Sequence, residues 1–267
     1  MSKKVLYITQ EITPFVPETP ISLIGRELPE DIQERGYEVR VFMPKWGIIN
    51  ERRGQLHEVI RLSGMNLIIN DTDHPLIIKV ASIPDTRIQV YFIDNDDYFS
   101  RRGMSHDAEG EDYPDNGERA VFFARGVLET AKKLRWMPDY IVCQGWVTAV
   151  VPLYLKTLYA EEPVFENAKV VTALYQQQIK GEFGKKFKEA VYFDNVDKSR
   201  LASYKDDFDF AELGKLAIDN ADAVAILHDE ANSTLVAHAK KKKMPLAKAT
   251  DIDMMADACD ELFKKFA

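Results

Sequence analysis

The feature that most constrains the fold is a strand–helix–strand pattern in the first 43 residues. Apolar residues fill Val5–Thr9, helical spacing follows in Ser22–Arg35, and Glu38–Met43 alternates with β-branched residues. Ser22 is the expected N-cap of the helix, and Gly36 is the residue that ends it. A helix that joins two adjacent strands implies a parallel pair with a right-handed crossover. We therefore expect an α/β fold.

The rest of the chain continues this alternation, with one interruption by short strands. The further predicted strands are His57–Leu62, Leu67–Ile69, Leu76–Ser82, Ile88–Ile93, Asp139–Cys143, Lys169–Leu174 and Ala223–Leu227, and the further predicted helices are Gly117–Leu134, Trp146–Tyr159, Ala211–Asn220, Asp229–Ala239 and Asp251–Phe266. The first four of these strands predict a β-hairpin excursion from the sheet, and Gln176–Asp209 shows no clear pattern. The sum predicts one domain over residues 1–267, built on a single Rossmann-like, doubly wound and mostly parallel sheet of about six or seven strands.

Charge and composition argue against several classes of function. The 267 residues carry 35 Lys and Arg against 43 Asp and Glu, a net charge of −8, whereas nucleic-acid binding needs a basic face. The one basic run, Lys240–Lys243, is better explained as the solvated end of a helix that Pro245 closes. No apolar stretch is long enough for a membrane span, and no signal peptide is recognisable. We expect no nucleic acid, no membrane and a cytoplasmic location.

The sequence predicts no metal and no cofactor. Cys143 and Cys259 lie far apart and make neither a zinc spacing nor a disulfide framework. None of the five histidines has a second histidine or a cysteine at ligand spacing. The acidic segment Asp107–Asp115 lacks the ligand spacing of a calcium loop, so a solvated loop is the simpler interpretation.

Candidate ligand-binding residues are sought just after the strands, because ligands of such sheets bind beyond the carboxyl ends. The loop after Thr9 contains Pro-Glu-Thr-Pro at residues 17–20 and no glycine, which suits phosphate poorly because proline lacks an N–H and glutamate repels anions. Gln144 and Thr148 could hydrogen-bond a sugar, and Trp146 could stack on one or belong to the core. No Walker, Gly-x-Gly-x-x-Gly or Gly-x-Ser-x-Gly motif is present, and residue chemistry alone predicts no catalytic group.

Two long motifs and several short ones follow one another in a characteristic order. They are Glu11, Pro14-Phe15-Val16, Leu28-Pro29, Gly36–Arg40, Met43-Pro44-Lys45, Tyr91–Arg101, Gly110–Arg119 with Phe122-Phe123, Pro138–Lys156 and Ala217–Ala231. In these segments, which cover nearly the whole chain, the sequence resembles the N-terminal domain of bacterial glycogen and plant starch synthases. The resemblance implies one half of a GT-B glycosyltransferase, in which two Rossmann-like domains flank a cleft. Such enzymes transfer glucose from ADP-glucose to an α-1,4-glucan, and the resemblance implies that their second domain is absent here.

Three polar motifs of that family are replaced in this sequence. Its Lys-x-Gly-Gly-Leu loop corresponds to Pro17–Ile21, its His-x-His-Asp-Trp motif to Val142–Trp146, and its Thr-Ile-His-Asn segment to Thr172–Tyr175. The lysine, glycines and histidines that would stabilise a leaving nucleotide diphosphate are gone, so we expect no catalytic residue and no transfer by the chain alone. The resemblance leaves a remnant cleft, whose expected residues are Gln144, Trp146, Thr148, Asp115, Asn116 and Arg119. Arg119 is expected to face Asp115 across one helical turn.

Two functions are compatible with this sequence. The first is a binding or regulatory module, which would hold a glucan or nucleotide sugar in the remnant cleft, or a protein partner or second copy on the surface that a second domain would cover. The alternative is an active ADP-glucose-dependent glucan glucosyltransferase completed by a separate chain that carries the second domain. A generic nucleotide-binding protein is a third hypothesis, and the glycine-free first loop argues against it.

Overall fold

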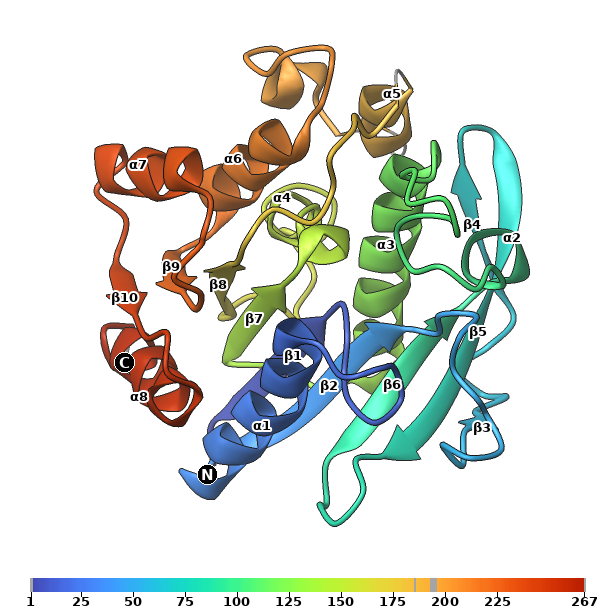
Figure 1. Ribbon diagram of the computed structural model, residues 1–267, viewed down its shortest axis with the longest axis horizontal. Helices are drawn as coiled ribbons and strands as arrows, with labels where there is room; N and C mark the ends of the chain where they lie inside the picture. The colour runs from blue at the N-terminus through green and yellow to red at the C-terminus, as the bar shows by residue number, and fades with distance from the viewer. Residues whose placement is uncertain (1, 185, 193–195, 267) are drawn as a thin grey trace.

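The computed structural model describes residues 2–184, 186–192 and 196–266, and within them ten strands form one sheet (Figure 1). The strands are β1 (Lys4–Thr9), β2 (Glu38–Pro44), β3 (His57–Glu58), β4 (Met65–Ile69), β5 (Thr72–Ser82), β6 (Gln89–Asp94), β7 (Tyr140–Gln144), β8 (Lys169–Leu174), β9 (Ala223–Ile226) and β10 (Leu246–Lys248). Their spatial order is β10-β9-β8-β7-β1-β2-β6-β5-β3, with β4 paired to β5. The seven neighbouring strands from β10 to β6 are all parallel, which confirms the predicted mostly parallel sheet.

Helices cover both faces of this sheet. They are α1 (Pro20–Glu34), α2 (Asp96–Phe99), α3 (Asn116–Leu134), α4 (Val151–Leu155), α5 (Phe187–Tyr192), α6 (Phe210–Asn220), α7 (Ser233–Lys241) and α8 (Ile252–Lys264). Figure 1 shows α1 and α8 in front of the sheet, with α3 and α4 behind it. The central strand is therefore apolar on both faces, and Val5, Leu6, Tyr7 and Ile8 of β1 are all fully buried.

The chain reverses its direction across the sheet at β1. From β1 it proceeds to β2 and β6 on one side, and it later returns to β7 on the other side and continues to β8, β9 and β10. The carboxyl ends of β1 and β7 lie side by side, with Thr9 paired to Gln144. In an open parallel sheet this reversal opens a crevice between the loops that follow the two strands, which is the usual position of a ligand site.

The predicted hairpin excursion is confirmed at the β6 edge of the sheet. β4 and β5 form an antiparallel hairpin, and its two turn residues, Asn70 and Asp71, both have positive φ angles of 48° and 63°. Such a turn suits the twist of two adjacent strands, and Asn and Asp tolerate this backbone region better than most residues. β5 then pairs antiparallel with β6, so the excursion extends the parallel sheet.

Helix α1 begins earlier than the sequence predicted, and Ser22 is not its N-cap. The N-cap is Thr19, whose hydroxyl accepts a hydrogen bond from the Ser22 amide at 3.0 Å. The Ser22 hydroxyl in turn accepts from the Thr19 amide at 2.8 Å, which completes a capping box. Pro20 occupies the first helical position, where a missing N–H costs nothing. The Pro-Glu-Thr-Pro stretch at residues 17–20 is therefore the start signal of this helix.

Other boundaries differ from the prediction for local reasons. The helix expected over Trp146–Tyr159 is split into a 3₁₀ turn, Trp146–Thr148, and the short α4, whose start contains Pro152. Helix α7 begins at Ser233 because Asn232 caps it. Strand β10 was not predicted, since three residues are too short for a visible alternation. In the segment without a clear pattern the structure forms α5, while residues 185 and 193–195 lie outside the described part.

Candidate functional site

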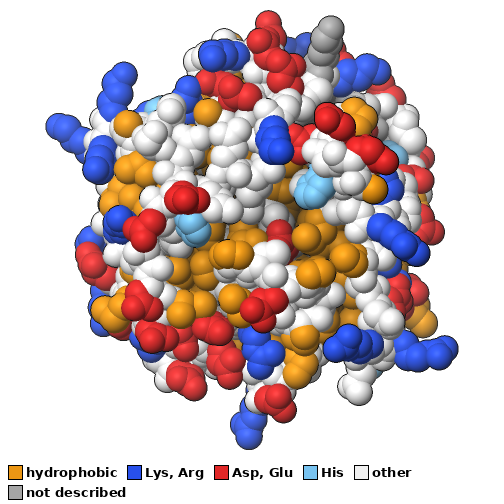
Figure 2. All heavy atoms as spheres, viewed as in Figure 1, with side chains coloured by type: hydrophobic (Ala, Val, Ile, Leu, Met, Phe, Trp, Pro, Cys, Tyr) orange, Lys and Arg blue, Asp and Glu red, His pale blue; other side chains and the backbone are white. Residues whose placement is uncertain are grey.

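A crevice of about 320 Å³ opens beyond the carboxyl ends of β1, β8 and β9, at the reversal point of the sheet. Figure 2 shows the molecule from the same side as Figure 1, with hydrophobic side chains gathered around the centre of this face and charged ones mostly toward its rim. The residues that line the crevice are Gln10, Glu11, Thr19, Pro20, Ile21, Met104, Ser105, His106, Tyr175, Gln176, Gln177, Gln178 and His228. Four of them are glutamines and two are histidines, and no lysine or arginine is among these described residues. The crevice thus offers amides, hydroxyls and imidazoles, with a single carboxyl group.

That carboxyl group belongs to Glu11, which is only 4% exposed. Its Oε2 accepts a hydrogen bond from the Thr19 hydroxyl at 2.7 Å, and its Oε1 accepts from the Gln10 side-chain amide at 2.5 Å. Both donors are neutral, and the ion pairs found in the described part of the chain do not include Glu11. Burial therefore dominates and raises the pKa of Glu11, although the two hydrogen bonds oppose the shift. Glu11 was not among the residues predicted for the site, since only its fold environment marks it as buried.

Gln144 lies directly beneath the crevice and holds three segments together. Its Oε1 accepts hydrogen bonds from the Tyr7 hydroxyl and, at 2.9 Å, from the Thr9 hydroxyl, and its Nε2 donates to the carbonyl of Ile21 at 3.1 Å. The side chain is fully buried, so β1, β7 and the start of α1 are fixed relative to one another. Gln144 consequently supports the floor of the crevice through protein–protein hydrogen bonds.

Gly145 lets the Gln10 side chain lie against the end of β7. Gly145 has a φ angle of 93°, and a Cβ atom at this position would come within 2.7 Å of both the Cβ and the Oε1 of Gln10. Only glycine adopts this backbone region readily, and only its missing side chain leaves room for Gln10. The Oε1 of Gln10 is buried and has no hydrogen-bond partner in the described structure. It is an acceptor at the wall of the crevice that a ligand can satisfy.

Trp146 and Thr148 lie behind the crevice and line a smaller cavity. The Trp146 ring is 3% exposed and packs 6.5 Å from the Trp46 ring and 5.9 Å from the Phe183 ring, measured between centroids. The Thr148 hydroxyl donates to the carbonyl of Gly145 at 2.8 Å. The sequence left two explanations for Trp146, a core residue or a ring that stacks on a sugar. The packing shows that Trp146 belongs to the core, and the stacking role stays a prediction.

The remaining three predicted residues lie at the start of α3, and their expected pairing is wrong. The Asp115 carboxylate pairs with Arg101, whose Nη1 lies 2.9 Å from its Oδ1. Arg119 is turned inward and fully buried, where its Nε donates to the carbonyl of Tyr98 and its Nη1 to the Oδ1 of Asn116, both at 2.8 Å. None of these three side chains lines the crevice, and whether they bind a ligand stays untested.

The environment of Arg119 is aromatic rather than acidic. Its guanidinium lies 5.0 Å from the centroid of the Trp46 ring, 5.2 Å from that of Tyr113 and 5.6 Å from that of Phe99. Burial, together with the nearby charge of Arg101, lowers the pKa of Arg119 to about 10. Arg119 thus stays charged at neutral pH and is stabilised by aromatic faces and two carbonyl oxygens.

A membrane-spanning helix and a metal site can be sought only among the described residues. Within residues 2–184, 186–192 and 196–266, no helix combines the length and the apolar character that a membrane span requires. In the same part of the chain, no group of three or more His, Cys, Asp or Glu side chains could hold a metal ion. Cys143 and Cys259 are both buried and free.

Comparison with known proteins identifies the family. The model of the starch synthase catalytic domain matches residues 4–229. This chain belongs to the starch synthase catalytic-domain family. The glycogen synthase of Chlorobium chlorochromatii is 39% identical over 196 residues, which cover 73% of this chain and 40% of that protein. The glycogen synthase of Chlorobium limicola is 40% identical over 173 residues, which cover 64% of this chain and 35% of that protein.

The chain thus spans two fifths or less of the length of these curated relatives. A solved structure, the catalytic domain of starch synthase IV from Arabidopsis thaliana bound to ADP and acarbose, superposes with a TM-score of 0.74. The sequence identity is 17%, and the match covers 93% of this chain and 51% of the plant chain. This likeness confirms the predicted fold, a Rossmann-like sheet of the kind found in GT-B glycosyltransferases.

In this starch synthase family member, segments that the resemblance matched to three family motifs meet at one place. Thr19, Pro20, Ile21 and Tyr175 belong to two of these segments and line the crevice. Gln144, from the third segment, donates to the Ile21 carbonyl at this crevice wall. The expected replacements would therefore be concentrated where an open parallel sheet places its ligand.

A pH-dependent stability difference is expected for Glu11→Gln. The folded-state pKa of Glu11 lies above its ordinary value of 4.5, so the folded protein binds the proton more tightly than the unfolded chain. The stability that the Glu11 carboxyl contributes is fully present below the pKa that it has in the unfolded chain. It is lost as the pH rises through the pKa that the carboxyl has in the folded protein. We expect Glu11→Gln to be more stable than the wild type at about pH 7.5 and the difference to vanish near about pH 4.5.

Urea denaturation of both proteins at several pH values measures this difference. Glu18→Gln is the matched control, because Glu18 lies in the same loop and its side chain is exposed to water. A constant gap between wild type and Glu11→Gln across the whole pH range would contradict the assigned pKa direction.

Proposed function

We propose that this glycogen/starch-synthase-like domain binds an α-glucan in the crevice and does not transfer glucose on its own. The observation that carries the proposal is the lining of the crevice, which has four glutamine amides, several hydroxyls and one buried carboxyl but no lysine or arginine among its described residues. Neutral donors and acceptors match sugar hydroxyls, whereas a nucleotide diphosphate needs cationic or backbone N–H partners.

The start of α1 supports the exclusion of a diphosphate. A helix N-terminus binds anions through its free N–H groups. Here Pro20 has no N–H, the Ser22 amide already donates to the Thr19 hydroxyl, and the Leu23 amide donates to the Thr19 carbonyl at 3.0 Å. The Glu11 carboxyl lies beside this helix start and adds negative charge when it ionises. Both effects disfavour an anionic ligand at this wall.

The plant structure with the same fold holds two kinds of ligand, ADP and acarbose. The crevice of this chain retains groups suited to the sugar-like ligand and not to the nucleotide. A protein that binds glucan without transferring glucose would serve as a binding or regulatory module. A protein partner or second copy is a further proposal that size-exclusion chromatography at high concentration tests.

Calorimetric titration with maltoheptaose, ADP and ADP-glucose tests the proposal. We expect saturable binding of maltoheptaose and no binding of either nucleotide at concentrations up to about 1 mM. Micromolar binding of ADP-glucose would overturn the proposal and favour the alternative, an active transferase completed by another chain. The absence of binding for all three ligands would also overturn it and direct the search to protein partners.

Removing one amide of the crevice is expected to weaken glucan binding. Gln176 is exposed at the rim, and one hydrogen bond contributes about 0.5–1.5 kcal/mol, so Gln176→Ala should raise the Kd for maltoheptaose about two- to tenfold. Gln33→Ala is the matched control, because Gln33 lies on α1 away from the crevice lining. Equal affinities of Gln176→Ala and the wild type would place the glucan elsewhere.

A further inference from the structure

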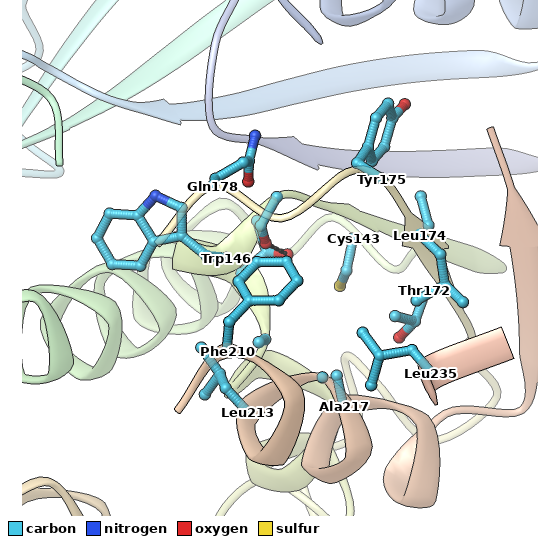
Figure 3. A pocket seen from close by; sticks show the side chains of 15 residues that line it. Cys143, Trp146, Thr172, Leu174, Tyr175, Gln178, Phe210, Leu213, Ala217 and Leu235 are labelled. Carbon is cyan, nitrogen blue, oxygen red and sulfur yellow. Dashed lines mark hydrogen bonds between the residues drawn. The ribbon is translucent and has the colours of Figure 1, made fainter. Parts of the chain in front are cut away.

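A second cavity, which we call the inner chamber, lies directly behind the crevice. It is lined by the ends of β7 and β8, the Trp146–Thr148 turn, the segment that follows β8, and helices α6 and α7. Tyr175 and Gln178 line both the crevice and the inner chamber, so these two side chains form the wall between them. Figure 3 shows the chamber with the labelled side chains around it.

The inner chamber is largely apolar and uncharged. Phe210 and Leu213 of α6 and Leu235 of α7 face the ends of the strands across it, and all three are buried. Figure 3 shows the sulfur of Cys143 directed into the same space. Burial raises the pKa of the Cys143 thiol far above its ordinary range, so this group is neutral too. An ionic ligand would find no counter-charge among the described residues that line the chamber.

Four buried polar atoms on residues that line the chamber lack a hydrogen-bond partner in the described structure. They are the indole Nε1 of Trp146, the hydroxyl Oγ1 of Thr172, the hydroxyl of Tyr175 and the side-chain Oε1 of Gln178. Trp146 and Thr172 are only 3% and 6% exposed. Buried polar groups in folded proteins almost always have a partner, so an unpaired donor, hydroxyl and acceptor around one cavity indicate that something binds there.

The size of the chamber limits what can enter. The centre of a water-sized sphere can move through about 40 Å³ of the chamber. On the same measure, one water molecule needs about 10–15 Å³. The chamber therefore holds about three waters or one small ring, and a hexose with its hydroxyl groups is too large. Apolar cavities favour an apolar occupant over water, because water there loses hydrogen bonds.

We propose that the inner chamber binds a small uncharged ring that is apolar except for one hydrogen-bonding atom, such as a phenol or the aryl group of a glycoside. The aromatic or aliphatic body of the ring packs on Phe210, Leu213 and Leu235. Its polar atom pairs with the Thr172 hydroxyl or the Gln178 Oε1. The chamber adjoins the crevice at Gln178, so one ligand can place its aryl group in the chamber and its sugar in the crevice. The placement of the sugar rests on the proposed glucan binding.

Two titrations separate the chamber from the crevice. The first uses phenol alone, which tests the chamber without any sugar, and the second compares phenyl α-maltoside with methyl α-maltoside. We expect saturable phenol binding, and phenyl α-maltoside binding at least about fivefold more tightly than methyl α-maltoside. No phenol binding would overturn the proposal, and so would equal affinities for the two maltosides when both bind. If neither maltoside binds, the glucan proposal fails and the phenol titration alone decides on the chamber.

Variants of the chamber wall give the matched comparison. Ala217 is 2% exposed on α6 and lines the chamber, so Ala217→Leu fills it and should lower phenol affinity at least about tenfold. Ala211→Leu, on the same helix but outside the chamber lining, should leave phenol affinity unchanged.

A second variant keeps the test valid if Ala217→Leu does not fold, as circular dichroism would show. Thr172→Val keeps the shape of the wall and removes the unpaired hydroxyl, and we expect it to weaken phenol binding at least about threefold. Phenol affinity that is the same in the wild type, Ala217→Leu and Thr172→Val would overturn the assignment to this chamber.

Discussion

Gly25→Ala is expected to lower the free energy of unfolding by about 3 kcal/mol or more, because α1 crosses the loop after β1 at this glycine. A Cβ atom at Gly25 would lie 2.0 Å from the carbonyl oxygen of Glu11 and 3.3 Å from the Oγ1 of Thr9. The nearer atom belongs to the backbone, so the helix or the loop must shift. Since Thr19 and Glu11 are hydrogen-bonded across this contact, the shift also opens the crevice wall.

Urea denaturation and maltoheptaose titration of Gly25→Ala measure both effects. Gly181→Ala is the control, since a Cβ there would have only the Asp112 Oδ2 at 3.5 Å within reach, an ordinary contact distance. We expect the control to stay within about 0.5 kcal/mol of the wild type. A Gly25→Ala protein as stable as the control would mean that the helix and the loop are not held as tightly as the structure shows.

Arg119→Ala should be the second severe substitution, with a loss of about 3–5 kcal/mol. The change leaves a cavity among aromatic rings and deprives the Tyr98 carbonyl and the Asn116 side chain of their donor. Arg119→Lys keeps the charge, but its single ammonium nitrogen cannot occupy the positions of both Nε and Nη1, so we expect an intermediate loss of about 2 kcal/mol.

Thermal unfolding is the direct measurement for the Arg119 variants. For a chain of this size a loss of 3–5 kcal/mol lowers Tm by roughly 10 °C. Arg102→Ala is the matched control, because Arg102 is exposed in the neighbouring loop, and its Tm should change by less than about 2 °C. A Tm change of that small size for Arg119→Ala would show that the buried guanidinium contributes little to the fold.

The family and the fold were both accessible from the sequence. The apolar run Val5–Thr9, the predicted helix Ser22–Arg35 and the alternation in Glu38–Met43 correspond to β1, α1 and β2 within one or two residues. Hydrophobic periodicity reports which face of an element is buried, and it works well for long buried strands and amphipathic helices. It failed for β10, where three residues carry too little pattern, and for α4, where Pro152 interrupts the helix.

The candidate site was less accessible. Thr19 and Ser22 are both good N-cap residues, and local sequence does not decide between them. Asp115 and Arg119 have the spacing of a helical ion pair, but Arg101, which precedes the helix, takes the carboxylate instead. Gln144 follows a strand and suggested an exposed binding group, yet hydroxyl groups of the neighbouring strand β1 surround it. In each case the partner comes from an element that periodicity cannot place.

The sequence by itself determined the family and most of the order of strands and helices. Only the tertiary structure decided that Glu11 is a buried carboxyl in a crevice whose described lining holds no lysine or arginine. It also decided that Thr172 and Gln178 leave polar atoms unpaired beside an apolar chamber. The physical reason is that periodicity depends on neighbours along the chain. Desolvation depends instead on side chains brought together from distant segments, here the loop after β1, the end of β8 and helix α6.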